Sequence, residues 1–153
     1  MSLEDDIHQD EGFHSEWQKL GVNLTYTFYW SRDKLKGFFS EFDITMQQFN
    51  VLLILRGQHP KPVSTSFLRE RLLDKMSDTS RIVDRLVKRE LVERTSCKTD
   101  KRLVDVLITE EGLALLSQID QRMDDLEDIY TKLSEAEAKQ LNWLLDRLRG
   151  GNY

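Results

Sequence analysis

Cysteine is nearly absent from this sequence, which excludes a disulfide scaffold. The single cysteine, Cys97, has no partner for an intrachain disulfide. The three histidines, at positions 8, 14 and 59, have no zinc-like spacing relative to Cys97. The sequence therefore predicts neither a disulfide framework nor a metal site, and it suggests no cofactor.

Long hydrophobic runs are missing as well. No apolar segment approaches the roughly 18 uninterrupted residues that a membrane-spanning helix needs. The N-terminus, MSLEDDIHQDEG, has neither the basic nor the apolar region of a secretion signal. We therefore expect a cytoplasmic protein without a membrane partner. With 39% hydrophobic and 32% charged residues, the composition is that of one globular domain.

Residue arrangements typical of enzymes do not stand out either. The sequence offers no evident Ser/His/Asp, Cys/His or paired-carboxylate constellation, so we expect no enzymatic activity. Cys97 lies between Arg94 and Lys98, cations that would favour a reactive thiolate. Because most single cysteines are inert, we predict no redox role for it.

The chain also lacks a net positive charge, but its charge is unevenly distributed. The formal net charge is −5 over the whole sequence. The segment from Arg69 to Arg102 holds 11 Lys and Arg against 7 Asp and Glu, a balance of +4 that leaves −9 for the remainder. An acidic protein with a local basic patch is repelled from DNA except where the patch docks. This distribution keeps a nucleic-acid partner open.

Apolar helical periodicity dominates both ends of the chain. Between positions 13 and 42, apolar residues recur at intervals of three, four or seven, which predicts a long first helix. Thr109 caps a later helix that extends to Leu133, and a Ser134–Glu137 capping box opens a last, leucine-rich helix. These apolar faces exceed what a small central module can cover. Either a homodimer covers them, or they form one larger monomeric core.

A second helix and a loop follow the long first helix. Thr45 and Gln48 form a capping box, and we expect this helix to end with Gly57 in the left-handed conformation. The only two prolines fall in GQHPKP, which is typical of a loop. The second helix is therefore predicted to be short.

Two further helices and a β-hairpin complete the middle of the chain. Ser64, Thr65 or Ser66 can cap a third helix that ends near Asp74, and Ser77 can cap a fourth. The runs LVERTS and RLVDVLIT are typical of two strands joined by the polar turn CKTDK. Two helices joined by a short turn and followed by a hairpin have the order of a winged helix-turn-helix. The expected fold class is mainly α with a small β-hairpin wing.

The exposed face of the fourth helix has the residue types of a DNA reader. Such a helix needs small polar side chains in its first turns and long hydrogen-bond donors after them. The candidates are Thr79, Ser80, Arg81, Arg85 and Lys88, with Ser64 and Ser66 on the preceding helix as donors to phosphate. The alternative is a solvated helix face on which Asp84 and Lys88 form an i,i+4 pair.

The hairpin tip adds positive charge beside that helix. Lys98, Lys101 and Arg102 lie in or next to the predicted turn. Arg102 could enter a minor groove with Asp100 holding it extended, while Lys98 meets a phosphate. The alternative is a solvated turn in which Asp100 bonds its own backbone.

These segments resemble a known family. SRIVDRLVKRELVER, the triplet Asp100-Lys101-Arg102 and VLITEEGLALL are similar to the winged-helix signature of the MarR (multiple antibiotic resistance regulator) family. The resemblance covers nearly the whole chain. It implies a single domain over 1–153, with a winged-helix core over 45–109 and dimerisation helices over 11–42 and 110–150.

The resemblance implies a homodimeric, sequence-specific transcriptional regulator, and a repressor in particular. In such proteins the wing Arg enters the minor groove, and many members release DNA when a small, often phenolic ligand occupies a cleft between dimer and DNA-binding regions. The residues that match the reader-helix and D-x-R wing patterns are Ser80, Arg81, Asp84, Arg85, Leu86, Asp100 and Arg102. A two-fold dimer would place two readers roughly 34 Å apart, which implies a pseudo-palindromic operator in double-stranded DNA.

One position departs from the family pattern. The family usually has Gly where Glu90 stands in KRELVER. A left-handed residue at the end of a helix is costlier for Glu than for Gly. We therefore expect the reader helix to be closed differently here.

Two further hypotheses concern the ligand and the partner. Tyr26, Tyr29 and Trp30 are candidates to line an effector cleft, although packing or dimer contacts are the favoured explanation for them. A competing function is a winged-helix protein-interaction module without DNA binding. The presence of Arg81 and Arg85 on the fourth helix disfavours that alternative.

Overall fold

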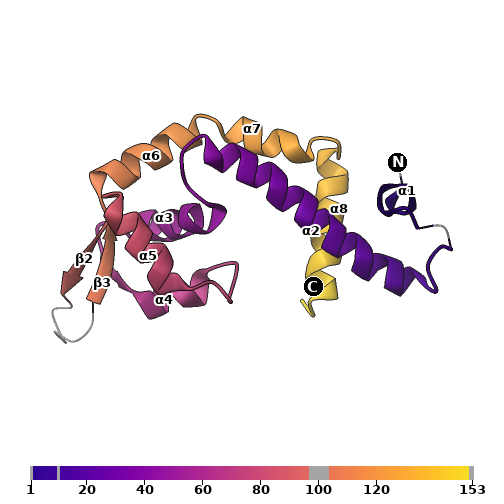
Figure 1. The fold of residues 1–153 in the computed structure, drawn as a ribbon, viewed down its shortest axis with the longest axis horizontal. Helices are drawn as coiled ribbons and strands as arrows, with labels where there is room; N and C mark the ends of the chain where they lie inside the picture. Colours follow the sequence, from indigo (N-terminus) through magenta and orange to yellow (C-terminus); the bar gives the residue numbers. More distant parts are fainter. Residues whose placement is uncertain (1, 10, 97–103, 152–153) are drawn as a thin grey trace.

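The computed structural model describes residues 2–9, 11–96 and 104–151, and it confirms a mainly helical chain with a small antiparallel sheet. Figure 1 shows the winged-helix part, with α3, α4, α5 and the strands, at one end and α2 crossed by α8 at the other, with α6 and α7 bridging them. The elements in chain order are α1 (Leu3–Ile7), α2 (Glu16–Ser40), α3 (Met46–Gln58), β1 (Val63–Ser64), α4 (Thr65–Arg71), α5 (Thr79–Lys88), β2 (Val92–Ser96), β3 (Val104–Ile108), α6 (Glu110–Asp120), α7 (Met123–Glu127), the 3-10 turn η1 (Asp128–Tyr130) and α8 (Glu135–Leu148).

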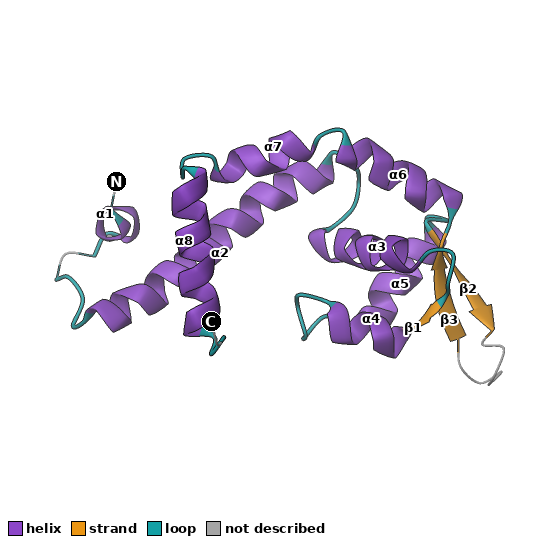
Figure 2. Cartoon of the chain, turned by 180° about the vertical axis from the view of Figure 1, so that it is seen from behind, coloured by secondary structure: helices purple, strands orange, loops and turns teal. Residues whose placement is uncertain are grey.

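The predicted hairpin is present, and a third strand extends it. The strand order is β1-β3-β2, with both pairings antiparallel, and Figure 2 shows the sheet from behind. Val106 lies opposite Val63 on one side and Arg94 on the other. The two residues of β1 are too few for a periodic signal, which is why the sequence did not predict that strand.

One hydrophobic core joins the helices of the winged-helix part to one face of the sheet. Its completely buried members come from α2, α3, α4, α5, α6, β2 and β3, and include Phe39, Leu52, Leu68, Val83, Leu86, Val92, Val106 and Leu116. α5 contacts α3, α4 and β2 directly. Because interiors are close-packed, these contacts fix which side of α5 faces outward.

Several predicted helix starts are confirmed by side-chain caps. Capping boxes occur at Thr45 with Gln48 and at Ser134 with Glu137. Two hydrogen bonds from Ser134 lower the pKa of the Glu137 carboxyl, and the one from the Ser134 side chain contributes more than the one from the Ser134 backbone N–H. Thr109 caps α6 by accepting from Gly112 N at 3.1 Å. These caps depend on residues only three apart, so the sequence is sufficient to predict them.

Three boundary predictions were wrong. α3 continues to Gln58, and Gly57 is not among the residues with positive φ. The third helix, α4, already ends at Arg71 rather than near Asp74. The cap of α5 is Asp78 rather than Ser77, because the Asp78 carboxylate accepts from Arg81 N at 3.1 Å while Ser77 Oγ donates to Asp74.

The helix predicted to run from Thr109 to Leu133 is broken. It ends at Asp120 and resumes at Met123. Arg122, at the break, donates to Glu41 at 2.5 Å and to Asp125 at 2.7 Å. Its guanidinium also lies over two aromatic rings of the α2 end, those of Phe38 and Phe42. The hydrogen bonds to Glu41 and Asp125 raise the pKa of the Arg122 guanidinium above its ordinary value, and the bond to Glu41 contributes most. These contacts with the end of α2 are tertiary, so the helical periodicity alone could not locate the break.

The end of α5 keeps the left-handed closure despite its Glu, so the expectation of a different closure was wrong. Glu90 has φ of 58°, and Leu91 N donates to Leu86 O at 3.0 Å. Thr109 Oγ1 donates to Glu90 O at 2.6 Å. A Cβ at Gly112 would lie 2.3 Å from Leu91 O, so α6 begins directly against this closure. The hairpin and α6 therefore hold Glu90 in a conformation that suits Gly better.

We predict that Glu90→Gly stabilises the protein by about 1 kcal/mol, because Gly adopts the left-handed conformation without the Cβ clash. Urea denaturation of the purified chain measures this as a higher midpoint. Glu90→Ala is the matched control, since it removes the same carboxylate but keeps the Cβ, and it should give no such gain. Equal stabilisation by both substitutions would contradict the backbone explanation.

Candidate nucleic-acid interface

α4 and α5 form a helix-turn-helix, and α5 presents two chemically different sides. Its inner side carries Val83 and Leu86, which are completely buried. Its outer side carries Ser80, Arg81, Arg85 and Lys88, which are all exposed. We call these four residues the cationic face. No ion pair engages its three basic side chains within the described part of the chain.

The hydroxyl residues of α4 lie at its first turn, as predicted. Ser64 is the N-cap, and its Oγ accepts from Phe67 N at 3.1 Å. Ser66 is exposed. The Ser64 hydroxyl can still donate its proton outward, because accepting from Phe67 leaves the O–H free.

Thr79 was predicted to lie on the reading face, and this expectation was wrong. Its side chain is only 2% exposed, and its Oγ1 is buried without a hydrogen-bond partner among the described residues. Thr79 is the first residue of α5, four positions before the buried Val83, and one helical turn brings such residues to the same side. It therefore packs inward and cannot contact an external ligand.

The predicted wing residues Lys98, Asp100, Lys101 and Arg102, together with Cys97, lie outside the described residues. The two strands that flank this segment are described, and they pair over their full lengths from Val92 with Ile108 to Ser96 with Val104. The hairpin is therefore confirmed as an element.

Arg89 and Arg94, two cations of the basic stretch close to α5, are engaged by other elements of the protein, which the sequence did not predict. Arg89, at the end of α5, donates to the carbonyl of Asp43, and its Nη2 lies 3.7 Å from the Asp43 carboxylate. Arg94, on β2, donates to the carboxylate of Asp84 on α5. The Asp84–Lys88 pair of the alternative interpretation is not the one that forms in the described structure. No local spacing signals either contact, since both join separate elements.

A cleft of about 1060 Å³ lies between α2 and the winged-helix part. Its basic lining residues are Arg32, Lys36, Arg85, Lys88 and Arg89, and its apolar ones are Phe28, Ile44, Met46 and Leu73. Arg85 and Lys88 therefore belong both to this interlobe cleft and to the cationic face. Asp43 and Asp74 line the cleft as well, but the basic side chains outnumber them, so the lining suits a small anionic ligand with an apolar body.

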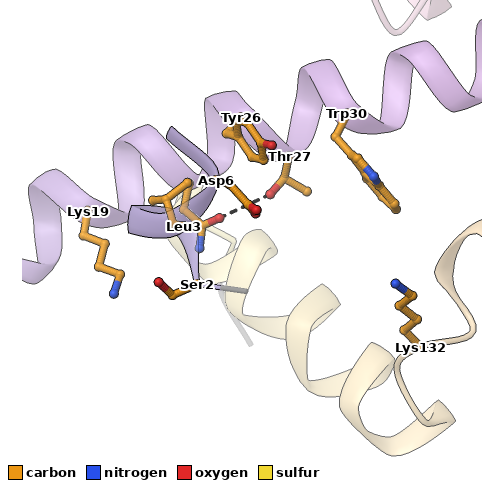
Figure 3. A pocket seen from close by; sticks show the side chains of 9 residues that line it. Ser2, Leu3, Asp6, Lys19, Tyr26, Thr27, Trp30 and Lys132 are labelled. Atoms are coloured by element: carbon orange, nitrogen blue, oxygen red, sulfur yellow. Dashed lines mark hydrogen bonds between the residues drawn. The ribbon is translucent and has the colours of Figure 1, made fainter. Parts of the chain in front are cut away.

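The three predicted effector residues do not line the interlobe cleft. Tyr26 and Trp30 line another cavity, of about 740 Å³, which Figure 3 shows between α1, α2 and Lys132. Trp30 also packs edge-on against Tyr130 at 6.3 Å. Tyr29 contacts Phe28 edge-on and lies under the guanidinium of Arg32 at 4.7 Å. The three aromatic residues therefore do not form one pocket.

An apolar groove of about 760 Å³ runs between α2 and α8. Its apolar lining residues are Trp17, Leu20, Leu24, Leu141, Leu144, Leu145 and Leu148, and all of them except Leu145 are exposed. Contiguous exposed apolar side chains of this kind mark an interaction surface. The predicted apolar stripes of the terminal helices are thus real, and α2 and α8 leave them uncovered within one chain.

The described residues show neither a metal site nor a membrane-spanning helix. They contain no group of three or more His, Cys, Asp or Glu side chains placed to hold a metal ion. None of the described helices combines the length and apolar character that crossing a membrane requires.

The helix-turn-helix, the paired strands that follow it and the cationic face define the class of protein. A winged helix-turn-helix with an exposed, basic second helix is a nucleic-acid-binding fold.

Comparison with known proteins gives the family. The family model described as MarR family matches residues 44–104. The multiple antibiotic resistance protein MarR of Salmonella typhimurium is 33% identical over 129 residues, which are 82% of this chain and 88% of that protein. The chain belongs to the MarR family.

Other relatives agree with this assignment. The HTH-type transcriptional regulator PecS of Dickeya dadantii is 29% identical over 112 residues, 72% of this chain and 68% of its own length. The crystal structure of a mutant MarR from E. coli, complexed with operator DNA, is similar with a TM-score of 0.77 and 27% identity over 97% of this chain and 99% of that chain. The protein is thus a DNA-binding transcriptional regulator of the MarR family, a class of regulators rather than enzymes.

Proposed function

We propose that the protein binds a pseudo-palindromic operator as a homodimer, inserts α5 of each protomer into the major groove and represses transcription. The cationic face carries this proposal. Its basic side chains are exposed and free of ion pairs in the described structure, whereas Arg89 and Arg94 nearby are engaged. The similarity to E. coli MarR complexed with operator DNA supports the same choice of partner.

Within the cationic face, chemistry suggests a division of roles. Arg81 and Arg85 can fork onto guanine edges, while Ser80 makes adaptable short hydrogen bonds and Lys88 meets a phosphate. The Ser64 and Ser66 hydroxyls would donate to phosphates, which their position at the start of α4 supports.

For the wing, the proposal rests on the sequence. Arg102 enters the minor groove with Asp100 as its orienting partner, and Lys98 and Lys101 contribute to phosphate binding. The triplet Asp100-Lys101-Arg102 matches the D-x-R pattern by which the chain resembles its family. A winged helix used only for protein contacts would have no need of these cations.

A test uses operator DNA obtained by genome-wide selection of bound fragments. Arg81→Gln and Arg102→Ala should each weaken binding by roughly 1 to 3 kcal/mol in fluorescence anisotropy at fixed salt. Thr79→Val is the control on the buried side of α5, and it should leave affinity unchanged. Binding by the wild type should also weaken steeply as salt rises, because phosphate contacts release counterions.

The outcome also separates the competing function. A chain that selects no DNA, or binds with a flat salt response, would favour a protein-interaction module. An effect of Thr79→Val as large as that of Arg81→Gln would contradict the assignment of the outer side of α5.

The homodimer is proposed from the apolar groove between α2 and α8. A second copy offers the same apolar stripes, so a two-fold contact would cover both grooves at once. This division assigns 11–42 and 110–150 to dimerisation and 45–109 to DNA binding within one domain over 1–153. The dimer would set the spacing of the two α5 helices to successive major grooves.

We predict that Leu144→Glu shifts the protein to monomer and abolishes tight operator binding. Leu144 is 44% exposed in the groove, and a buried unpaired carboxylate should raise the dimer dissociation constant at least about 100-fold. Sedimentation velocity measures the mass. Val104→Glu, at a side chain that is 46% exposed on β3, is the matched control and should remain dimeric. A dimeric Leu144→Glu variant would place the interface elsewhere.

For the effector, we propose a small aromatic anion in the interlobe cleft rather than a site formed by Tyr26, Tyr29 and Trp30 together. The cleft combines apolar side chains such as Phe28 and Leu73 with several cations. Because Arg85 and Lys88 also line the cleft, an anion bound in it would neutralise part of the positive charge on the surface proposed to bind DNA.

A hydroxybenzoate should therefore bind and release operator DNA, whereas the corresponding uncharged hydroxybenzamide should not. Lys36 lines the cleft from α2 and has no ion pair in the described structure. Lys36→Met should weaken hydroxybenzoate binding about tenfold in calorimetry while sparing DNA affinity. Equal binding of the acid and the amide would refute an electrostatic site.

A further inference from the structure

An acidic side chain lies within the cationic face of α5. Asp84 is three positions after Arg81 and four before Lys88, so all three share one side of the helix. Its side chain is 50% exposed. A carboxylate on a surface that approaches DNA repels the phosphates, so this position is electrostatically unfavourable unless another role outweighs the repulsion.

Arg94 reaches this carboxylate from the sheet. Side chains two apart on a strand share one face, so Arg94 points to the same side of β2 as the buried Val92. It also lies opposite the buried Val106 of β3. This face of the sheet packs against the core that includes α5. The aliphatic part of the Arg94 side chain therefore lies at the edge of the core, and Arg94 Nη2 donates to Asp84 Oδ1.

The stability of the fold does not explain the pair. The Asp84 side chain is 50% exposed and that of Arg94 is 42% exposed. Ion pairs with this exposure contribute little to the free energy of unfolding, because water already solvates both partners. The pair nevertheless joins two specific elements, the reader helix and the strand that leads into the wing. A contact between α5 and β2 can restrict the angle between these two elements.

We propose that Asp84 and Arg94 are positioning residues for operator binding. This inference rests on the proposed function of α5. The pair fixes α5 against the β2–β3 hairpin, so that both present one surface to the duplex. It also neutralises the carboxylate within the cationic face. Arg94 acts through Asp84 and contacts no phosphate, although it belongs to the basic stretch of the sequence.

The direction in which one substitution changes the operator affinity separates a positioning role from simple repulsion. Asp84→Asn removes a negative charge from a DNA-facing helix, so without a positioning role it would tighten binding. With a positioning role it weakens binding about fivefold. Arg94→Gln should weaken binding by a similar factor. The double variant should be no weaker than either single variant, because each change breaks the same contact.

The experiment measures affinity of the full-length chain for selected operator DNA by anisotropy across a salt series. Asp84→Glu keeps the charge and should retain most of the affinity. Glu93→Gln is the matched control, since Glu93 is exposed and points to the other side of β2. It should leave binding unchanged or slightly tighter. Melting temperatures of all variants should stay near that of the wild type, which excludes a general loss of fold.

Two results would overturn the inference. Tighter binding by Asp84→Asn would show that the carboxylate only repels DNA. A salt-dependence slope reduced by about one in Arg94→Gln would show that Arg94 itself meets a phosphate. A wild-type chain that binds no DNA would instead refute the proposed function, and the positioning role with it.

Discussion

The structure depends on the packing of α5 between α3, α4 and the edge of the sheet. Val83 and Leu86 are completely buried there, and Thr79 faces inward with them. A helix held along one side cannot rotate without exposing these side chains to water. The opposite side, with Arg81 and Arg85, is therefore held toward solvent. The position of every candidate DNA contact on α5 follows from this burial.

The charges around α5 divide into two groups with different physical roles. Arg89 and Arg94 are bonded to Asp43 and Asp84, and thereby connect the helix to the α2–α3 loop and to β2. The basic side chains of the cationic face remain free of ion pairs in the described chain. An acidic protein can in this way direct a limited number of cations at a polyanion while its remaining surface repels it. Two of these cations, Arg85 and Lys88, also border the interlobe cleft, which links a ligand there to the surface proposed to bind DNA.

The terminal helices contribute a second constraint. α2 and α8 cross each other and leave an apolar groove that one chain does not fill. Arg122 ties the end of α2 to α7 through Glu41 and Asp125, next to the start of the winged-helix part. These ion pairs therefore join α2 and α7 next to the start of the winged-helix part. In the proposed homodimer, this arrangement would help to keep a fixed spacing between the two DNA-binding parts.

Features that depend on neighbouring residues could be predicted before any coordinates were known. These include the capping boxes at Thr45 and Ser134, the cap at Thr109 and the hairpin. The order of the longer helices and the hairpin, without α1 and β1, and the resemblance carried by SRIVDRLVKRELVER also came from the sequence, and they were sufficient for the fold class and the family. Such signals lie within a few residues of one another, so local geometry preserves them.

Which of these residues are available for binding depends on long-range packing, and the coordinates were needed to show it. This packing buried Thr79, joined Asp84 to Arg94 instead of Lys88, and broke the helix at Arg122. It also kept Glu90 left-handed and distributed Tyr26, Tyr29 and Trp30 over different contacts. Each of these outcomes depends on a partner far away in the chain or on the direction in which a helix is buried. Spacing along the sequence contains neither, because long-range packing selects among local patterns that are equally acceptable by themselves.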